Sequence, residues 1–215
     1  QWLDDLEGEV LSPEDAIRTL AEHGWQYAEL SSEHSKILMD RENPCAAGSA
    51  LARQAADLHF YITQGHLKLS ADIADSSRWP AELDELKTWL DMYLAVGIRC
   101  AVLHPGGYTQ LAGGVPREQV LEKQVSALSA LTEHLRKTDL AICLENGGSF
   151  SSTAEDILGL IRAAGSEHLG ICLDTGHLHL SKKNKSQLDF IRGAGSSLKA
   201  LHIADYRPEI GALNM

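Results

Sequence analysis

Residues 170–177 read Gly-Ile-Cys-Leu-Asp-Thr-Gly-His, an apolar run that ends in a carboxylate, with an imidazole three residues later. The length and the aliphatic content of this run predict a buried strand. A buried carboxylate is costly unless it is paired or bound to a metal. Asp174, and His177 on the same turn, therefore indicate a functional site at the end of a strand.

Short apolar runs of this kind recur along the chain and alternate with segments of helical spacing. Strands are expected over the apolar runs Tyr27–Leu30, Leu58–Ile62, Cys100–Leu103, Leu140–Leu144, Gly170–Leu173 and Leu198–Ile203. Helices are expected from Ser12, over Ala81–Val96, from Pro116 to Arg136 and from Thr153 to Gly165, where capping residues and helical spacing coincide. Strands that alternate with helices predict parallel pairing through right-handed crossovers, which is an α/β fold.

Such a chain closes either as an open doubly wound sheet or as a barrel. Gly106-Gly107 and Gly147-Gly148 are pairs and do not form the Gly-x-Gly-x-x-Gly turn of a dinucleotide-binding sheet. A complete barrel has about 250 residues, whereas this chain has 215, begins on a helix and stops just after a strand. We expect a TIM (β/α)8 barrel that lacks its first and last strands in this sequence, as one domain over residues 1–215 that is incomplete at both ends.

Charge and composition restrict the kinds of partner and the cellular compartment that we expect. The chain has 19 Lys+Arg against 30 Asp+Glu, a formal net charge of −11, which disfavours a nucleic-acid partner. We find no apolar run near the roughly 20 residues that span a membrane, and the acidic start is unlike a signal peptide. The four cysteines are scattered and form no Cys-x-x-Cys pair, which fits a cytoplasmic protein without disulfides.

Ionisable side chains stand at or just after the ends of the apolar runs. They are Glu29, His66, His104, Glu145, Asp174 and His202. In a parallel barrel these ends open on one face, which carries the active site. Carboxylates and imidazoles that converge there would repel and desolvate one another, and a bound divalent cation offsets this. Glu145 is the strongest candidate, because it closes a nearly continuous apolar strand.

The chain resembles the xylose isomerase-like barrels, a group that includes sugar and sugar phosphate isomerases and epimerases and the family 2 apurinic endonucleases. The segments that carry the resemblance are residues 103–107 (Leu-His-Pro-Gly-Gly), 143–146 (Cys-Leu-Glu-Asn), 170–177 and 201–205 (Leu-His-Ile-Ala-Asp). They stand in the order and spacing of the family, and the similarity spans about residues 10 to 206.

The resemblance implies that Glu145, Asp174 and His202 hold one divalent metal ion. Two carboxylates and one imidazole, without a thiolate, suit Mn, Mg, Co or Zn. The resemblance also implies catalytic roles for Glu145, as an acid/base, and for His177, which would contact the substrate. His66 and His104 would line the same substrate pocket. The fourth ligand of the family is a Glu on the final strand, and this sequence ends before such a strand.

This sequence differs from the nucleases of the group at motif positions, and these differences help to choose between the nuclease branch and the isomerase branch. The nucleases have Pro-Tyr after the first histidine and Asp-Thr-Cys-His later, whereas this chain has Leu67-Lys68 after His66 and a glycine at position 176. With the acidic charge, this favours a metal-dependent isomerase or epimerase of carbohydrate metabolism. Its substrate would be a small sugar, ketose or sugar phosphate that passes through an enediolate intermediate.

Two alternatives remain open. One is a zinc-dependent apurinic endonuclease-like phosphodiesterase with three zinc ions, and the other is a sugar-binding relative that has lost catalysis. The expected partner is a small molecule, with no nucleic acid and no membrane, and an exposed helix layer would allow a homo-oligomer.

Overall fold

The computed structural model describes residues 11–147, 150–180, 186–207 and 212–214. These residues fall into two compact units. The first contains residues 11–69 and 84–101, and the second contains residues 70–83 and those from 102 onward. The four cysteines are free thiols, and Cys143 and Cys172 are buried. Among the described helices, none is both long and apolar enough to cross a membrane.

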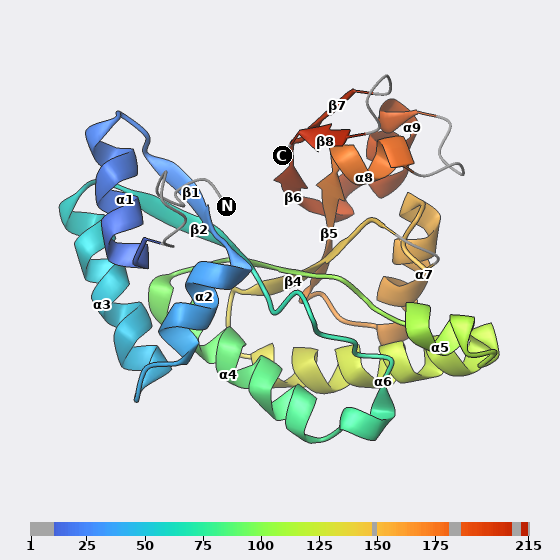
Figure 1. Cartoon of the computed structure of the whole chain (residues 1–215). Coiled ribbons are helices and arrows are strands. Elements are labelled where there is room, and N and C mark those ends of the chain that lie inside the picture. The colour runs from blue at the N-terminus through green and yellow to red at the C-terminus, as the bar shows by residue number, and fades with distance from the viewer. Residues whose placement is uncertain (1–10, 148–149, 181–185, 208–211, 215) are drawn as a thin grey trace. The chain divides into compact units, whose positions relative to one another are not determined.

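The first unit alternates helices with parallel strands (Figure 1). Its elements are α1 (Pro13–Glu22), β1 (Tyr27–Leu30), α2 (Ser32–Met39), α3 (Pro44–Asp57), β2 (Tyr61–His66), most of α4 (Ala81–Val96) and the start of β3 (Cys100–Leu103). β1 and β2 pair in parallel, with Tyr27 opposite Tyr61. The Arg99 N–H donates to the Thr63 carbonyl at 2.9 Å, which places the start of β3 beside β2.

Residues of α4 form much of the core of the first unit. Trp89 and Tyr93 are buried and pack edge to face, with ring centroids 6.2 Å apart. The Tyr93 hydroxyl lies 2.8 Å from the buried Ser35 hydroxyl and donates to the His66 carbonyl. A buried hydroxyl needs such partners, so these bonds tie the end of β2 to the core.

The second unit repeats the alternation. Its elements are η1 (Ser76–Arg78), α5 (Tyr108–Ala112), α6 (Arg117–Leu135), β4 (Ala141–Glu145), α7 (Ala154–Ala164), β5 (Leu169–Asp174), α8 (Thr175–Leu180), α9 (Gln187–Ala194), η2 (Gly195–Ser197), β6 (Leu198–His202), β7 (Asp205–Arg207) and β8 (Ala212–Asn214). β4, β5 and β6 pair in parallel, and β7 and β8 form a separate antiparallel pair. Every residue of β4 and β5 is buried, as expected of parallel strands covered on both faces.

These elements confirm the α/β class, and most expected strands match to within a residue at each end. The bounds expected for the strand over Leu58–Ile62 are wrong, because α3 continues to Asp57 and β2 runs from Tyr61 to His66. His59 adopts a left-handed φ of 52°, and the Phe60 N–H bonds back to the Ala55 carbonyl. The apolar residues at 58 and 60 therefore belong to a helix end. The sequence analysis does not predict helices α2, α3, α5, α8 and α9.

Candidate active site at the ends of β4, β5 and β6

The second unit brings together the three residues expected to bind a metal. Glu145, Asp174 and His202 are the last residues of β4, β5 and β6, so parallel pairing places them at the same edge of the sheet. Each offers one ligand atom, and these atoms all lie within 4.8 Å of one another. His202 Nδ1 is 3.1 Å from Glu145 Oε1 and 3.8 Å from Asp174 Oδ2.

The chemistry of this cluster fits a divalent cation. Glu145 and Asp174 keep only 2% and 5% of their surface exposed. Two carboxylates buried this close to each other require compensating positive charge. The set offers two oxygen donors and one imidazole nitrogen without a thiolate, which suits Mg, Mn, Co or Zn. That these residues bind a metal remains a prediction.

His177 lies against the same carboxylates from the first turn of α8. Its backbone N–H donates to Asp174 Oδ1 at 2.8 Å, and its Nδ1 lies 2.9 Å from the Asn146 carbonyl oxygen and 3.2 Å from Glu145 Oε1. The hydrogen bond to Glu145 raises the pKa of His177 to about 9, against the opposing effect of burial. The imidazole thus lies against Glu145 and Asp174, and its role toward the substrate stays a prediction.

His104 approaches Glu145 from the other side. Its Nε2 lies 2.8 Å from Glu145 Oε2, and its ring centroid is 5.9 Å from that of His177. The two oxygens of Glu145 therefore face different groups: Oε1 faces His177 and His202, whereas Oε2 faces His104.

His66 belongs to the first unit, at the end of β2. Its Nδ1 lies 2.7 Å from the Leu67 carbonyl oxygen. Glu29 also closes a strand in this unit and accepts a hydrogen bond from the Gln64 amide at 2.7 Å. A substrate-lining role for His66 stays a prediction.

The sequence analysis missed residues that support the site. Asn146 exchanges hydrogen bonds with the backbone of Asp174. Asp72 accepts a hydrogen bond from the backbone of Gly107, in the loop that follows His104. Asn146 directly follows Glu145, so its position was a usable signal. Nothing in the sequence near Asp72 links it to that loop.

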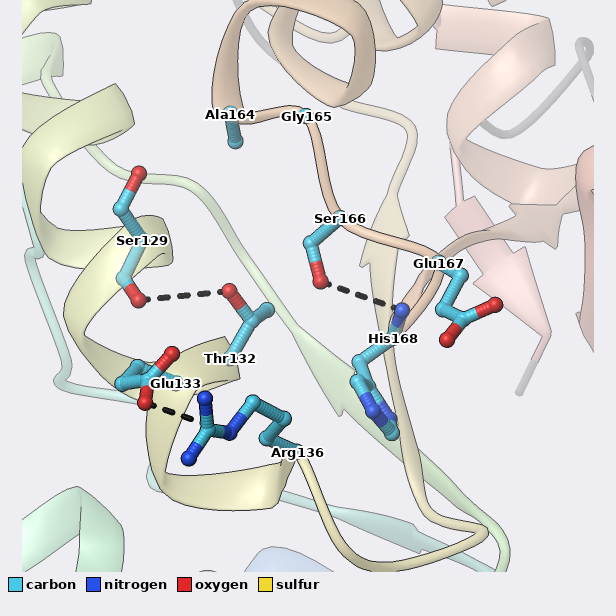
Figure 2. A pocket seen from close by; sticks show the side chains of 9 residues that line it. All are labelled: Ser129, Thr132, Glu133, Arg136, Ala164, Gly165, Ser166, Glu167 and His168. Atoms are coloured by element: carbon cyan, nitrogen blue, oxygen red, sulfur yellow. Dashed lines mark hydrogen bonds and ion pairs between the residues drawn. The ribbon is translucent and has the colours of Figure 1, made fainter.

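A hollow of about 530 Å³ lies at the other end of β5 (Figure 2), where the chain enters the strand. Its lining residues are Ser129, Thr132, Glu133, Arg136, Ala164, Gly165, Ser166, Glu167 and His168. Glu133 and Arg136 form an ion pair at 3.4 Å, and Ser166 accepts a hydrogen bond from the His168 backbone. None of the predicted site residues lines this hollow, so we place the candidate chemistry at the opposite strand ends.

Comparison with known proteins gives the same fold. The model of the family described as "Xylose isomerase-like TIM barrel" matches residues 17–213. A solved D-psicose 3-epimerase, crystallised in the presence of D-fructose, superposes with a TM-score of 0.76 at 17% identity, covering 91% of this chain and 68% of that one. A 3-keto-D-glucoside 4-epimerase from E. coli gives a TM-score of 0.73 at 18% identity, covering 91% and 75%. At these identities the similarity shows the fold alone, and it confirms the expected TIM barrel class.

The curated relatives carry a different name. A protein of Metamycoplasma arthritidis called "Probable endonuclease 4" is 29% identical over 132 residues, which cover 60% of this chain and 46% of that protein. This chain thus spans less than half of that relative. The expectation that nucleic acid is not a partner finds no support here, because the relatives are named as endonucleases. The acidic net charge is a property of the whole chain and says little about any one face of it.

Proposed function

Since the chain belongs to the xylose isomerase-like TIM barrel family, we propose that it is a metal-dependent isomerase or epimerase of a small ketose or sugar phosphate. The observation that carries this proposal is the convergence of Glu145, Asp174 and His202 at adjacent strand ends. The epimerases among the solved structures of this fold support the same reaction class. Specificity resides in the loops after the strands, so the individual sugar is not part of the proposal.

The residues divide into metal-holding and substrate-handling groups. Glu145, Asp174 and His202 would hold the ion, which when bound polarises a carbonyl oxygen and stabilises negative charge that develops on it. Glu145 removes the proton from the carbon next to the carbonyl, and the electron pair left behind forms the enediolate. Delivery of a proton to the opposite face of the same carbon by a second acid, the part that the family resemblance gives to a Glu on the final strand, yields an epimer. Return of the proton from Glu145 to the neighbouring carbon yields an isomer. His177 donates a hydrogen bond to a substrate oxygen.

The test combines metal analysis with isotope exchange. The metal content of the purified protein is measured, and ketoses and ketose phosphates are then incubated with the protein and that metal in D₂O. We expect deuterium to enter at the carbon next to the carbonyl, together with the epimer or isomer. Glu145→Gln should lower both rates by about a hundredfold or more while the protein stays folded. Wild-type turnover in that variant would remove Glu145 from the mechanism.

One observation favours the phosphodiesterase as a second candidate. The two oxygens of Glu145 face separate imidazoles, His202 on one side and His104 on the other. A carboxylate placed in this way suits a site with more than one ion, as in enzymes that cleave phosphodiesters. The relatives called endonuclease point in the same direction. Three zinc ions per chain and cleavage of a DNA duplex at an abasic position would favour this candidate, whereas a single ion favours the isomerase.

A further inference from the structure

The loop that leaves β3 has a left-handed backbone that glycine adopts far more readily than other residues. Gly106 and Gly107 have left-handed φ values of 69° and 90°. A Cβ atom added to Gly106 would lie 2.3 Å from Asp72 Oδ1, and one added to Gly107 would lie 2.7 Å from Val120 Cγ1. Other residues would be strained in this backbone and would also clash. The turn directs the chain into α5, which begins with Tyr108.

Buried polar side chains from separate segments fix this loop. Asp72 Oδ1 accepts the Gly107 N–H at 2.9 Å. Gln124, which is fully buried, donates its Nε2 to the carbonyl oxygens of Pro105 and Gly106 at 3.0 and 3.1 Å. Hydrogen bonds shielded from water hold the backbone firmly. The position of Tyr108 is therefore set before a ligand arrives.

The phenol of Tyr108 reaches the candidate active site. A Cβ atom added to Gly147 would lie 3.7 Å from the Tyr108 hydroxyl oxygen and 3.7 Å from His177 Nδ1. The Tyr108 hydroxyl oxygen and His177 Nδ1 therefore both lie near the position of that Cβ atom, and the distance between them is at most twice 3.7 Å. The Ser151 side chain hydrogen-bonds the phenol, and burial, with a smaller contribution from Glu145, raises the pKa of Tyr108. The hydroxyl is therefore protonated at neutral pH. The Ser151 hydroxyl donates to the Gly147 carbonyl oxygen at 3.1 Å, so it accepts the phenol proton, and the phenol oxygen keeps a lone pair for a ligand.

We propose that Tyr108 is a substrate-binding residue whose hydroxyl oxygen, held near Gly147, accepts a hydrogen bond from a hydroxyl group of the bound sugar. The inference rests on the proposed function. Tyr108 is not enclosed by the protein, because 42% of the surface of the residue remains exposed, and its hydroxyl lies near Gly147. Gly147 does not have a left-handed backbone, so we assign its lack of a side chain to the space that the sugar needs.

The test uses Tyr108→Phe and Gly147→Ala in the metal-loaded protein. Calorimetry measures the affinity for Mn²⁺ and then for ketoses and ketose phosphates, and kinetics separates KM from kcat. Tyr108→Phe removes one hydrogen bond, so we expect sugar binding to weaken and KM to rise about five- to tenfold, with Mn²⁺ affinity unchanged. Gly147→Ala fills the space without a steric clash, and it should weaken sugar binding at least as much while the melting temperature stays the same.

Matched controls are Tyr27→Phe, on an exposed tyrosine of the first unit, and Gly159→Ala in α7, where an added methyl meets nothing within 4 Å. Both should bind sugar as the wild type does. If the wild type binds sugar and Tyr108→Phe binds it equally well, the assignment of Tyr108 is wrong and the proposed function stands. If the metal-loaded wild type binds none of the sugars, the proposed function and the assignment of Tyr108 both fall.

Discussion

The side-chain amide of Asn146 exchanges two hydrogen bonds with the backbone of Asp174. Its Nδ2 donates to the Asp174 carbonyl oxygen at 3.0 Å, and its Oδ1 accepts from the Asp174 N–H at 2.6 Å. Asn146 follows β4, so the amide continues the pairing of β4 with β5 beyond the last residue of β4. Only 1% of Asn146 is exposed, and water therefore does not compete for these bonds. The amide fixes the spacing between Glu145 and Asp174.

Asn146→Ala should weaken both the fold and the metal site. The change leaves a buried N–H and a buried carbonyl of Asp174 without partners, which should lower the free energy of unfolding by about 2 kcal/mol. It also frees Asp174 to move relative to Glu145, and loss of such a supporting partner lowers metal affinity by about 10- to 100-fold. Urea denaturation and calorimetric titration with Mn²⁺ measure the two effects separately.

Ser35→Ala is the matched control. Ser35 is fully buried and shares a hydrogen bond with Tyr93 in the first unit. Its loss should lower stability without changing Mn²⁺ affinity. If Asn146→Ala behaves in the same way, Asn146 supports the fold alone and has no part in positioning the ligands.

Bound metal should stabilise the protein through Glu145 and Asp174. An ion that binds only the folded state, present at a hundred times its dissociation constant, adds about 2.7 kcal/mol to the free energy of unfolding. We expect MnCl₂ or ZnCl₂ to raise the melting temperature of the wild type and EDTA to reverse this. Asp174→Asn removes one anionic ligand and should abolish most of the rise.

Glu133→Gln serves as the control for that experiment, because Glu133 pairs with Arg136 on the surface of α6. This variant should keep the full metal-dependent rise in melting temperature. A rise of equal size in Asp174→Asn would show that the ion stabilises the protein from some other place.

The positions of the candidate metal ligands could be predicted from the sequence because two local signals coincide. Glu145 and Asp174 each close an apolar run, and parallel strands present their carboxyl ends at one edge. Periodicity and chain direction thus suffice to bring them together. His202 follows the same rule at the end of β6.

Other features depend on contacts that the local sequence does not encode. Asp72 holds Gly107 across 35 positions of the chain, and no pattern near either residue signals that bond. Phe60 looks like a strand residue, but its N–H closes the end of α3 because His59 adopts a left-handed backbone. No local pattern around Tyr108 signals that its hydroxyl lies near Gly147, because the fold brings these two residues together.

Glycine-to-alanine changes at Gly106 and Gly159 should have opposite effects on stability. Gly106 has φ +69°, and an added Cβ would collide with Asp72 Oδ1, so Gly106→Ala should destabilise the protein by about 2 kcal/mol or more. Gly159 lies within α7, where an added methyl meets nothing within 4 Å. Gly159→Ala should stabilise the helix by about 0.5–1 kcal/mol. Chemical denaturation measures both, and a destabilised Gly159→Ala would contradict this account of α7.

The ion pair between Glu14 and Arg41 should make the stability depend on pH. Both Glu14 oxygens accept hydrogen bonds from the guanidinium, at 2.6 and 2.9 Å, and this contact holds the pKa of Glu14 below its usual value. A lowered folded-state pKa means that the stabilisation is fully present above the unfolded pKa of about 4.3 and disappears as the pH falls through the folded value. Glu14→Gln should therefore cost about 1 kcal/mol near neutral pH and progressively less below about pH 4.

Urea denaturation across this pH range measures that difference. Asp84→Asn is the control, because Asp84 is largely exposed where it pairs with Lys87. Solvent screens such a pair, so its removal should change the stability by a few tenths of a kcal/mol at most. A cost of Glu14→Gln that stays constant from neutral to acidic pH would show that packing of the side chain, and not its charge, stabilises this corner of the first unit.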